Sequence, residues 1–182
     1  MEKPHWRVRS STFVIDSPYM RLRKDEVELP NGTVVHDYYV RESLGFVMVV
    51  PVTITQEVVL IRQYRYGNDS LGLEFPAGML APGEDPLDCA KRELAEETGF
   101  TSQRWEKLFV AAAEPVRSNA VMHAYLAYDC ENTTAQSLDP TEHINVELET
   151  FAQALQLLRT GTIGSLACVA IGYAAFDRLG AL

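Results

Sequence analysis

The first third of the chain has the pattern of hydrophobic and polar positions expected of strands. Its segments are rich in β-branched and aromatic residues and partly alternate with polar ones, and Pro30-Asn31-Gly32 marks a turn between two of them. Two later segments are almost continuously apolar, which is typical of buried strands. The predicted strands are residues 7–15, 20–29, 34–41, 46–53 and 57–63.

The remaining two thirds mix strand composition with helical spacing. A helix is predicted to begin after Asp85, because Asp85 is suited to the cap position and Pro86 to the first helical position, and to end at Gly99. Two further helices are predicted at residues 151–160 and 166–179. Short strands are predicted at residues 71–75, 105–113 and 121–128. The pattern therefore favours a mixed α+β domain preceded by an N-terminal β segment.

Length and charge restrict the class of protein. The chain has 182 residues, with 47% hydrophobic and 23% charged residues, as in ordinary globular domains. The formal net charge is -9, so a phosphate backbone or an anionic membrane would be repelled. We therefore expect neither a nucleic acid nor a membrane as a partner.

The cysteines and the N-terminus indicate the compartment. Cys89, Cys130 and Cys168 are an odd number without CxxC spacing, which argues against a disulfide framework or a zinc site and favours a reducing environment. No apolar run follows the first ten residues, so they do not form a secretory signal. The expected location is the cytoplasm.

The candidate chemistry is concentrated in Gly78 to Phe100, GMLAPGEDPLDCAKRELAEETGF. Glu93 lies three positions before Glu96 and four before Glu97, so their carboxylates share one face of the predicted helix. Carboxylates held this close repel one another, and Mg²⁺ removes the repulsion because it prefers oxygen ligands. Arg92 can hold a neighbouring carboxylate by a bidentate contact. Acidic helix faces are also common on solvated surfaces, so the acids alone leave two interpretations open.

The full spacing favours the metal site. Gly78, Glu84, Arg92-Glu93-Leu94, Glu96-Glu97 and Gly99-Phe100 match the box of the Nudix hydrolases at every defined position. The resemblance implies an α+β fold, the Nudix α/β/α sandwich with a mixed sheet, preceded by an N-terminal antiparallel β segment. It implies two parts, a β segment at residues 1–44 that serves dimerisation and a Nudix hydrolase domain at residues 45–182.

The Nudix resemblance also implies the metal ligands. Glu93 and Glu97 are the leading ligands, and Glu96 and the main-chain carbonyl of Ala77 are further ones. Arg92, Glu93 and Glu97 are implied to be catalytic. Family chemistry is the attack of water on a phosphorus atom of a nucleoside diphosphate linked to another group, with Mg²⁺ as cofactor and Mn²⁺ as a substitute.

A narrower resemblance is to the ADP-ribose and ADP-sugar pyrophosphatases. LEFPAG at residues 73–78, RQYR at residues 62–65, Pro115 and the N-terminal VELPNGTVVHDYYV are similar to that subfamily. The resemblance implies a nucleotide sugar as the small-molecule substrate, bound by Arg41, Arg65 and Pro115. It also implies a homodimer in which the N-terminal strands cross to the partner.

One feature departs from the subfamily. Relatives often carry an acidic residue after the proline, whereas Ser118-Asn119-Ala120 follow here and no acid occurs before Asp129. The resemblance then points to Glu142, in the later loop LDPTEHINV, as the residue that activates water. Glu142 as a solvated loop acid and Arg65 as a surface charge are the competing interpretations.

These observations favour Mg²⁺-dependent hydrolysis of the pyrophosphate bond of a nucleoside diphosphate sugar. ADP-ribose is the first substrate expected, with AMP and ribose 5-phosphate as products. GDP-mannose or a dinucleoside polyphosphate is the alternative substrate. A nucleotide sensor without turnover is the alternative class, but such sensors typically lose box carboxylates, and Glu84, Glu93, Glu96 and Glu97 are all present.

Overall fold

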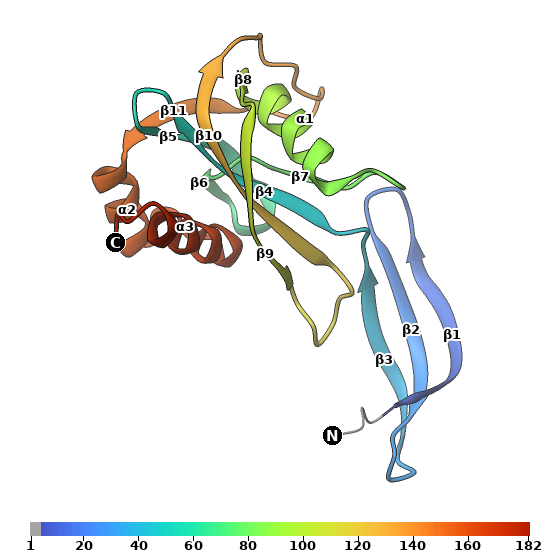
Figure 1. Cartoon of the computed structure of the whole chain (residues 1–182). Coiled ribbons are helices and arrows are strands. Elements are labelled where there is room, and N and C mark those ends of the chain that lie inside the picture. The colour runs from blue at the N-terminus through green and yellow to red at the C-terminus, as the bar shows by residue number, and fades with distance from the viewer. Residues whose placement is uncertain (1–4) are drawn as a thin grey trace. The chain divides into compact units, whose positions relative to one another are not determined.

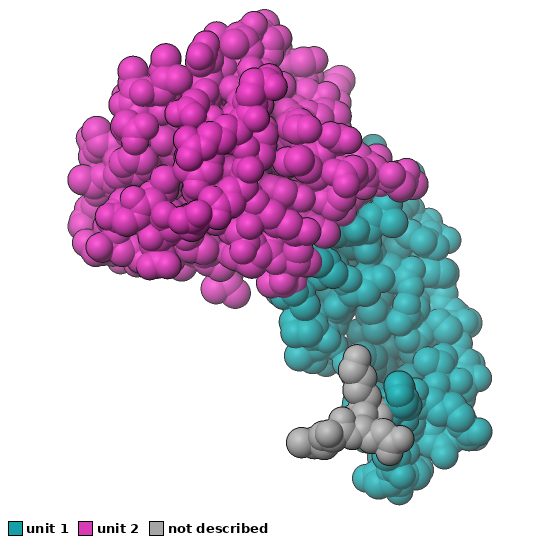
Figure 2. Space-filling view, viewed as in Figure 1, with its two compact units in different colours: residues 1–45, 112–121 teal, residues 46–111, 122–182 magenta. Residues whose placement is uncertain are grey.

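The computed structural model describes residues 5–182 and contains two compact units, each with its own sheet. Unit 1 consists of the chain through Gly45 together with residues 112–121, and unit 2 consists of residues 46–111 and 122–182 (Figure 2). The predicted boundary between residues 44 and 45 stays a prediction.

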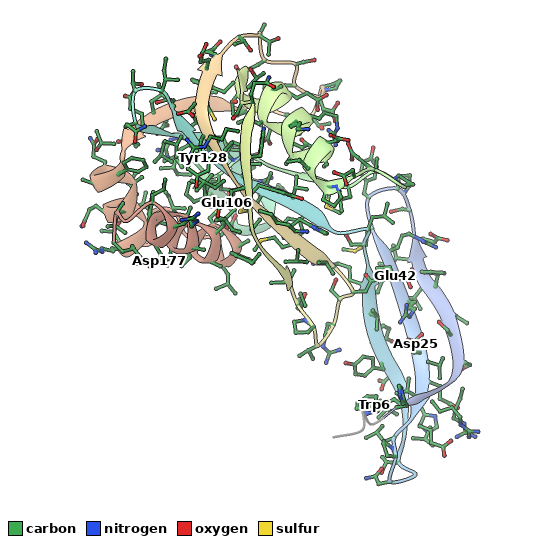
Figure 3. The ribbon with its side chains drawn as sticks, in the orientation of Figure 1. Trp6, Asp25, Glu42, Glu106, Tyr128 and Asp177 are labelled. Atoms are coloured by element: carbon green, nitrogen blue, oxygen red, sulfur yellow. The ribbon has the colours of Figure 1, made fainter. Side chains whose placement is uncertain are left out.

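Unit 1 contains a three-stranded antiparallel sheet in the order β1-β2-β3 (Figure 1). At the turn before β3, Gly32 has a φ of 82°, a conformation that glycine adopts without steric cost. Asp25 lies on β2 (Figure 3). It is buried and accepts hydrogen bonds from Ser11 Oγ at 2.6 Å and Arg23 Nε at 2.8 Å. Its charge is thereby satisfied within the unit. The strands are β1 (Arg7–Asp16), β2 (Arg21–Glu28) and β3 (Val34–Glu42).

Unit 2 is built on an eight-stranded sheet whose central path runs β11-β5-β4-β10-β8. β10 runs parallel to β4, whereas β5 and β7 run antiparallel to it, so the sheet is mixed as predicted. β6 pairs with β5, and β9 pairs with β10. The strands are β4 (Phe46–Thr53), β5 (Glu57–Arg65), β6 (Ser70–Glu74), β7 (Ala77–Met79), β8 (Phe100–Thr101), β9 (Arg104–Ala112), β10 (Val121–Asn132) and β11 (Asn145–Thr150).

Helices cover both faces of the unit 2 sheet (Figure 1). Alternate residues of β4 point to opposite faces. Val47 and Val49 pack with the buried face of α1 (Pro86–Thr98), and Met48 and Val50 pack with α2 (Phe151–Arg159) and α3 (Leu166–Arg178). This two-sided core confirms the predicted α/β/α sandwich.

A polar cluster fastens the end of α3 to the sheet. Glu106 lies on β9 and Tyr128 on β10 (Figure 3). Glu106 accepts hydrogen bonds from Tyr128 Oη at 2.7 Å and from Arg178 Nε of α3 at 2.6 Å. Arg178 lies in the last turn of α3, where a cation also interacts favourably with the helix dipole. The cluster therefore joins two strands and a helix outside the apolar core.

The predicted helices and longer strands are present with bounds shifted by one to a few residues. β7 and β8 were not predicted, because three-residue and two-residue strands are too short to show a period. Within residues 5–182, no helix combines the length and apolar character required to cross a membrane.

Candidate functional site

Helix α1 is fixed at both ends by local interactions. The Asp85 side chain accepts hydrogen bonds from the main-chain N–H groups of Leu87 and Asp88, at 2.8 and 3.4 Å. Gly99 ends the helix with a φ of 77°, and its N–H donates to Ala95 O at 2.9 Å. The face of the helix that packs on the sheet buries Cys89, Ala90 and Leu94, and Glu97 is buried on the same helix.

Arg92 gathers three carboxylates around the first turns of this helix. It donates to Glu84 through Nε at 2.9 Å and Nη2 at 3.2 Å, a bidentate contact that joins the helix to the preceding loop. Its Nη1 atom lies 2.8 Å from Glu93 Oε1 and 2.9 Å from Glu96 Oε2. With the N–H of Ala81, which also binds Glu84, Arg92 lowers the pKa of Glu84 to about 2. Glu84 is therefore ionised, and its carboxylate is hydrogen-bonded to Ala81 of the loop and to Arg92.

Strand β7 brings main-chain atoms against the acidic side of α1. Its antiparallel pairing with β4 places Gly78 opposite Val47. The Ala77 N–H donates to Glu97 Oε2 at 3.0 Å. A Cβ atom at Gly78 would lie 1.9 Å from the carboxyl carbon of Glu93, so a larger residue at position 78 would displace this side chain.

The carboxyl groups of Glu97 and Glu93 lie where burial disfavours their ionised form. Glu97 is 4% exposed, and burial followed by the nearby charges of Glu93 and Glu142 raises its pKa to about 8, although the Ala77 N–H opposes the shift. Burial also raises the pKa of Glu93, against the opposing effect of Arg92. A cation beside these two carboxylates would stabilise their ionised forms.

These acids border a pocket of about 660 Å³ that lies within unit 2. Seven residues predicted for the site from the sequence lie in its wall: Arg65, Ala77, Arg92, Glu93, Glu96, Glu97 and Glu142. The wall also contains residues that were not predicted to be functional: Gln63, Met79, Ser137, Leu138 and Asp139. The structure thus brings together segments that are up to 79 positions apart, from Gln63 to Glu142.

Arg65 is held in the pocket wall by an acid from the neighbouring strand. Its Nε and Nη2 atoms donate to the two carboxylate oxygens of Glu74 at 3.0 and 2.6 Å. This bidentate pair fixes the guanidinium and leaves further N–H groups for a ligand. Glu74 falls within the LEFPAG segment, but only the pairing of β5 with β6 reveals its contact with Arg65.

Glu142 enters the pocket from the loop between β10 and β11. Its carboxylate accepts a hydrogen bond from the Asp139 N–H at 3.0 Å, and its own N–H donates to Asp139 O at 2.9 Å. Glu147, farther along in β11, instead forms a bidentate pair with Arg62 at 2.5 and 2.9 Å. The two acids therefore have different surroundings, and only Glu142 borders the pocket.

The other two predicted substrate contacts lie in unit 1. Arg41 Nη2 is 3.9 Å from Glu114, and Pro115 lies in the adjacent turn. The roles assigned to Arg41 and Pro115 stay predictions.

The oxygen donors beside the pocket are of the kind that a hard divalent cation prefers, but their arrangement is not that of a metal site. The acidic residues Glu93, Glu96, Glu97 and Glu142 line the pocket, and the buried carboxyl of Glu97 has a raised pKa. In the part of the chain that the structure describes, however, no three His, Cys, Asp or Glu side chains converge closely enough to hold a metal ion. Glu93 and Glu96 are directed at Arg92, so a cation would have to draw them from the guanidinium.

Comparison with known families places this pocket in a recognised context. The family model described as NUDIX domain matches residues 45–166. A second model, described as Nucleoside diphosphate sugar hydrolase N-terminal domain, matches residues 6–40. The first match contains every residue of the pocket wall.

Individual proteins are also similar to this chain. The chain is 35% identical over 156 residues to the methanol dehydrogenase activator of Bacillus methanolicus, covering 85% of this chain and 84% of the relative. It is 32% identical over 140 residues to the ADP-ribose pyrophosphatase of Bacillus subtilis, covering 76% and 75%. The crystal structure of an ADP compounds hydrolase superposes with a TM-score of 0.85 at 24% identity, covering 100% of this chain and 98% of that one, which shows a shared fold.

Proposed function

The chain belongs to the Nudix family, and we propose that it hydrolyses the pyrophosphate bond of a nucleoside diphosphate sugar with Mg²⁺ as cofactor. The observation that carries the proposal is the composition of one pocket wall, where the arginine Arg65 and the carboxylates of Glu93, Glu96 and Glu97 occur together. A guanidinium recognises phosphate oxygens, and a carboxylate cluster takes a divalent cation.

ADP-ribose is the substrate we propose first, with AMP and ribose 5-phosphate as products. The relative in Bacillus subtilis is an ADP-ribose pyrophosphatase by name, and the N-terminal match is to a nucleoside diphosphate sugar hydrolase model. Hydrolysis adds the elements of water across the P–O–P bridge, so each product carries one terminal phosphate.

In this proposal the metal ligands are the carboxylates of Glu93, Glu96 and Glu97 and the carbonyl of Ala77. Mg²⁺, when bound, supplies positive charge that offsets the charge developing on the phosphates and polarises the attacking water. Arg92 holds Glu93 and Glu96 close together until a cation draws their carboxylates from it, and the Ala77 N–H holds Glu97 in place.

The remaining pocket residues bind the substrate and accept the proton. Arg65, fixed by Glu74, donates its free N–H groups to a phosphate. Glu142 accepts the proton of the attacking water as a general base, and the loss of its hydrogen bond from Asp139 would free the carboxylate for this step.

We also propose a homodimer that uses the N-terminal sheet. β1 is at the edge of its sheet, and its apolar side chains are exposed, including Val8 at 57%, Phe13 at 43% and Ile15 at 44%. An exposed apolar edge strand is a surface on which another chain pairs. Three unpaired cysteines support a reducing location, and we propose the cytoplasm.

The deciding experiment measures release of the nucleoside monophosphate, AMP or GMP according to the substrate, by the purified protein with Mg²⁺, with Mn²⁺ and with EDTA. The kcat/KM values are compared across ADP-ribose, ADP-glucose, GDP-mannose and a dinucleoside polyphosphate. We expect metal-dependent turnover that is fastest with a nucleotide sugar. Faster turnover of the dinucleotide would overturn the substrate assignment, and tight binding without turnover would identify a sensor.

A further inference from the structure

The carbonyl groups at the end of α1 are capped by a distant loop. The last carbonyls of a helix have no partner within the helix and must find one elsewhere. Glu96 O accepts the N–H of Ser137 at 2.9 Å, and Glu97 O accepts the Nε2–H of Gln136 at 2.6 Å. The turn that carries two proposed metal ligands is therefore completed by residues about 40 positions later in the chain.

Gln136 also binds the far end of the same loop. Its Nε2 atom, which donates to Glu97 O, lies 3.4 Å from Ile144 O. Both partners are carbonyl oxygens, which only accept, so the amide nitrogen and not its oxygen must face them. One side chain thus joins the start of the segment 137–143, its end, and helix α1.

The segment held in this way contains Glu142. Between the two attachment points, the one described hydrogen bond of the Glu142 carboxylate is local, from the Asp139 N–H at 3.0 Å. The position of Glu142 relative to Glu96 and Glu97 therefore depends largely on the hydrogen bonds that attach the loop to α1. A proton acceptor has to lie within hydrogen-bonding distance of the water that it activates.

We propose that Gln136 is a positioning residue that sets Glu142 against the metal-ligand turn of α1. The inference rests on the proposed function, because it assumes that Glu142 acts on the attacking water. Gln136 is not among the residues that line the pocket, and its described side-chain hydrogen bonds are to main-chain carbonyls and not to Arg65 or to the carboxylates proposed as metal ligands. Its loss should therefore change the rate of the chemical step and not the binding of substrate or metal.

The test replaces Gln136 by methionine, which has a similar length but no donor. Since a displacement of about 1 Å can cost about 10²-fold in rate, we expect Gln136→Met to lower kcat by about 10-fold to 10²-fold. KM and the Mg²⁺ concentration for half-maximal rate should stay within about 2-fold, a range typical of changes outside the site. Gln103→Met, at an exposed glutamine of the same unit, is the matched control and should keep the wild-type kcat.

A double variant separates positioning from general damage. In a Glu142→Gln background, Gln136→Met should cause no further loss, because residues that act as a unit are not additive. An equal loss in both backgrounds, or an unchanged kcat in the single variant, would overturn the inference. A Glu142→Gln variant with full activity would overturn it as well.

Hydrogen exchange provides a readout that does not depend on activity. Amides in residues 137–143 should exchange faster in Gln136→Met than in wild type, because the attachment limits local opening. Unchanged exchange would refute the attachment even if the enzyme is active. Conversely, a wild-type protein that releases no nucleoside monophosphate from any nucleotide sugar refutes the proposed function, whatever the exchange of the loop.

Discussion

The backbone of Gly78 lies so close to Glu93 that a Cβ atom at residue 78 would come within 1.9 Å of the Glu93 carboxyl. The neighbour is a side chain, so Glu93 has to move when residue 78 is enlarged. Gly78→Ala should therefore displace a proposed metal ligand while the fold is retained. The glycine and the glutamate of the sequence motif are linked by this close contact.

For Gly78→Ala we expect kcat to fall by about 10²-fold, because a metal ligand is moved from its productive position. Steady-state kinetics at several Mg²⁺ concentrations would measure this. Gly67→Ala is the control, since a Cβ atom at Gly67 meets nothing within 4 Å, and it should keep its activity. Wild-type kinetics in Gly78→Ala would show that the position of Glu93 does not matter for turnover.

Glu93→Gln and Glu97→Gln should each lower kcat by about 10²-fold or more, because each removes an anionic ligand from the proposed metal site. Both substitutions should also reduce the stabilisation of the folded protein by Mg²⁺. Mg²⁺ at 100 times its Kd would stabilise the wild-type protein by about 2.7 kcal/mol, and the variants by less at the same concentration. Thermal melts with and without Mg²⁺ would measure the difference. Near-wild-type turnover and an unchanged Mg²⁺ shift in both variants would remove these residues from the ligand set.

Glu142→Gln should lower kcat by roughly 10²-fold to 10⁴-fold, the range for a general base, with little change in KM or in the Mg²⁺ requirement. Glu147→Gln is the control, because Glu147 pairs with Arg62 and does not border the pocket. It should leave kcat within about 2-fold, as expected outside a functional site. The reverse order of effects would mean that the water is activated elsewhere.

The Arg62–Glu147 pair should make stability depend on pH at the acidic end. Arg62 lowers the pKa of Glu147 below its ordinary value, so the ionised pair stabilises the folded state above about pH 4.5 and this contribution is lost as the pH falls through the lowered pKa. Both side chains are about one third exposed, so we expect the contribution to be at most about 1 kcal/mol. Urea unfolding of wild type and Glu147→Gln at pH 7 and pH 3 would measure it. A difference that grows toward pH 3 would contradict the assignment.

The proposed dimer should have twice the chain mass of 20.4 kDa at micromolar concentration. Placing a charge on the exposed apolar strand, as in the double variant Val8→Glu/Ile15→Glu, should produce monomers because a buried unpaired charge destabilises an interface. Sedimentation equilibrium would measure both. Leu71→Glu, at an exposed apolar residue of unit 2, is the control and should remain dimeric. A monomeric wild type would refute the dimer.

The sequence by itself determined helix α1 and its ends. The Asp85 cap, Pro86 at the first helical position and the Gly99 stop act over three or four residues, so they can be read without knowing the fold. The spacing of Glu93, Glu96 and Glu97 on that helix is equally local. Long apolar strands were predicted for the same reason, because their period is visible within each segment.

Only the tertiary structure decided which distant groups meet. The contact between Gly78 and Glu93 depends on the register of β7 beside β4, and the Arg65–Glu74 pair depends on that of β5 and β6. Gln136 gave no sign of a role, since a single glutamine in a loop has no period or motif. Its hydrogen bond to Glu97 O forms because a loop about 40 residues later in the chain lies against the end of α1. Contacts of this kind are set by the packing of the whole unit and not by local spacing.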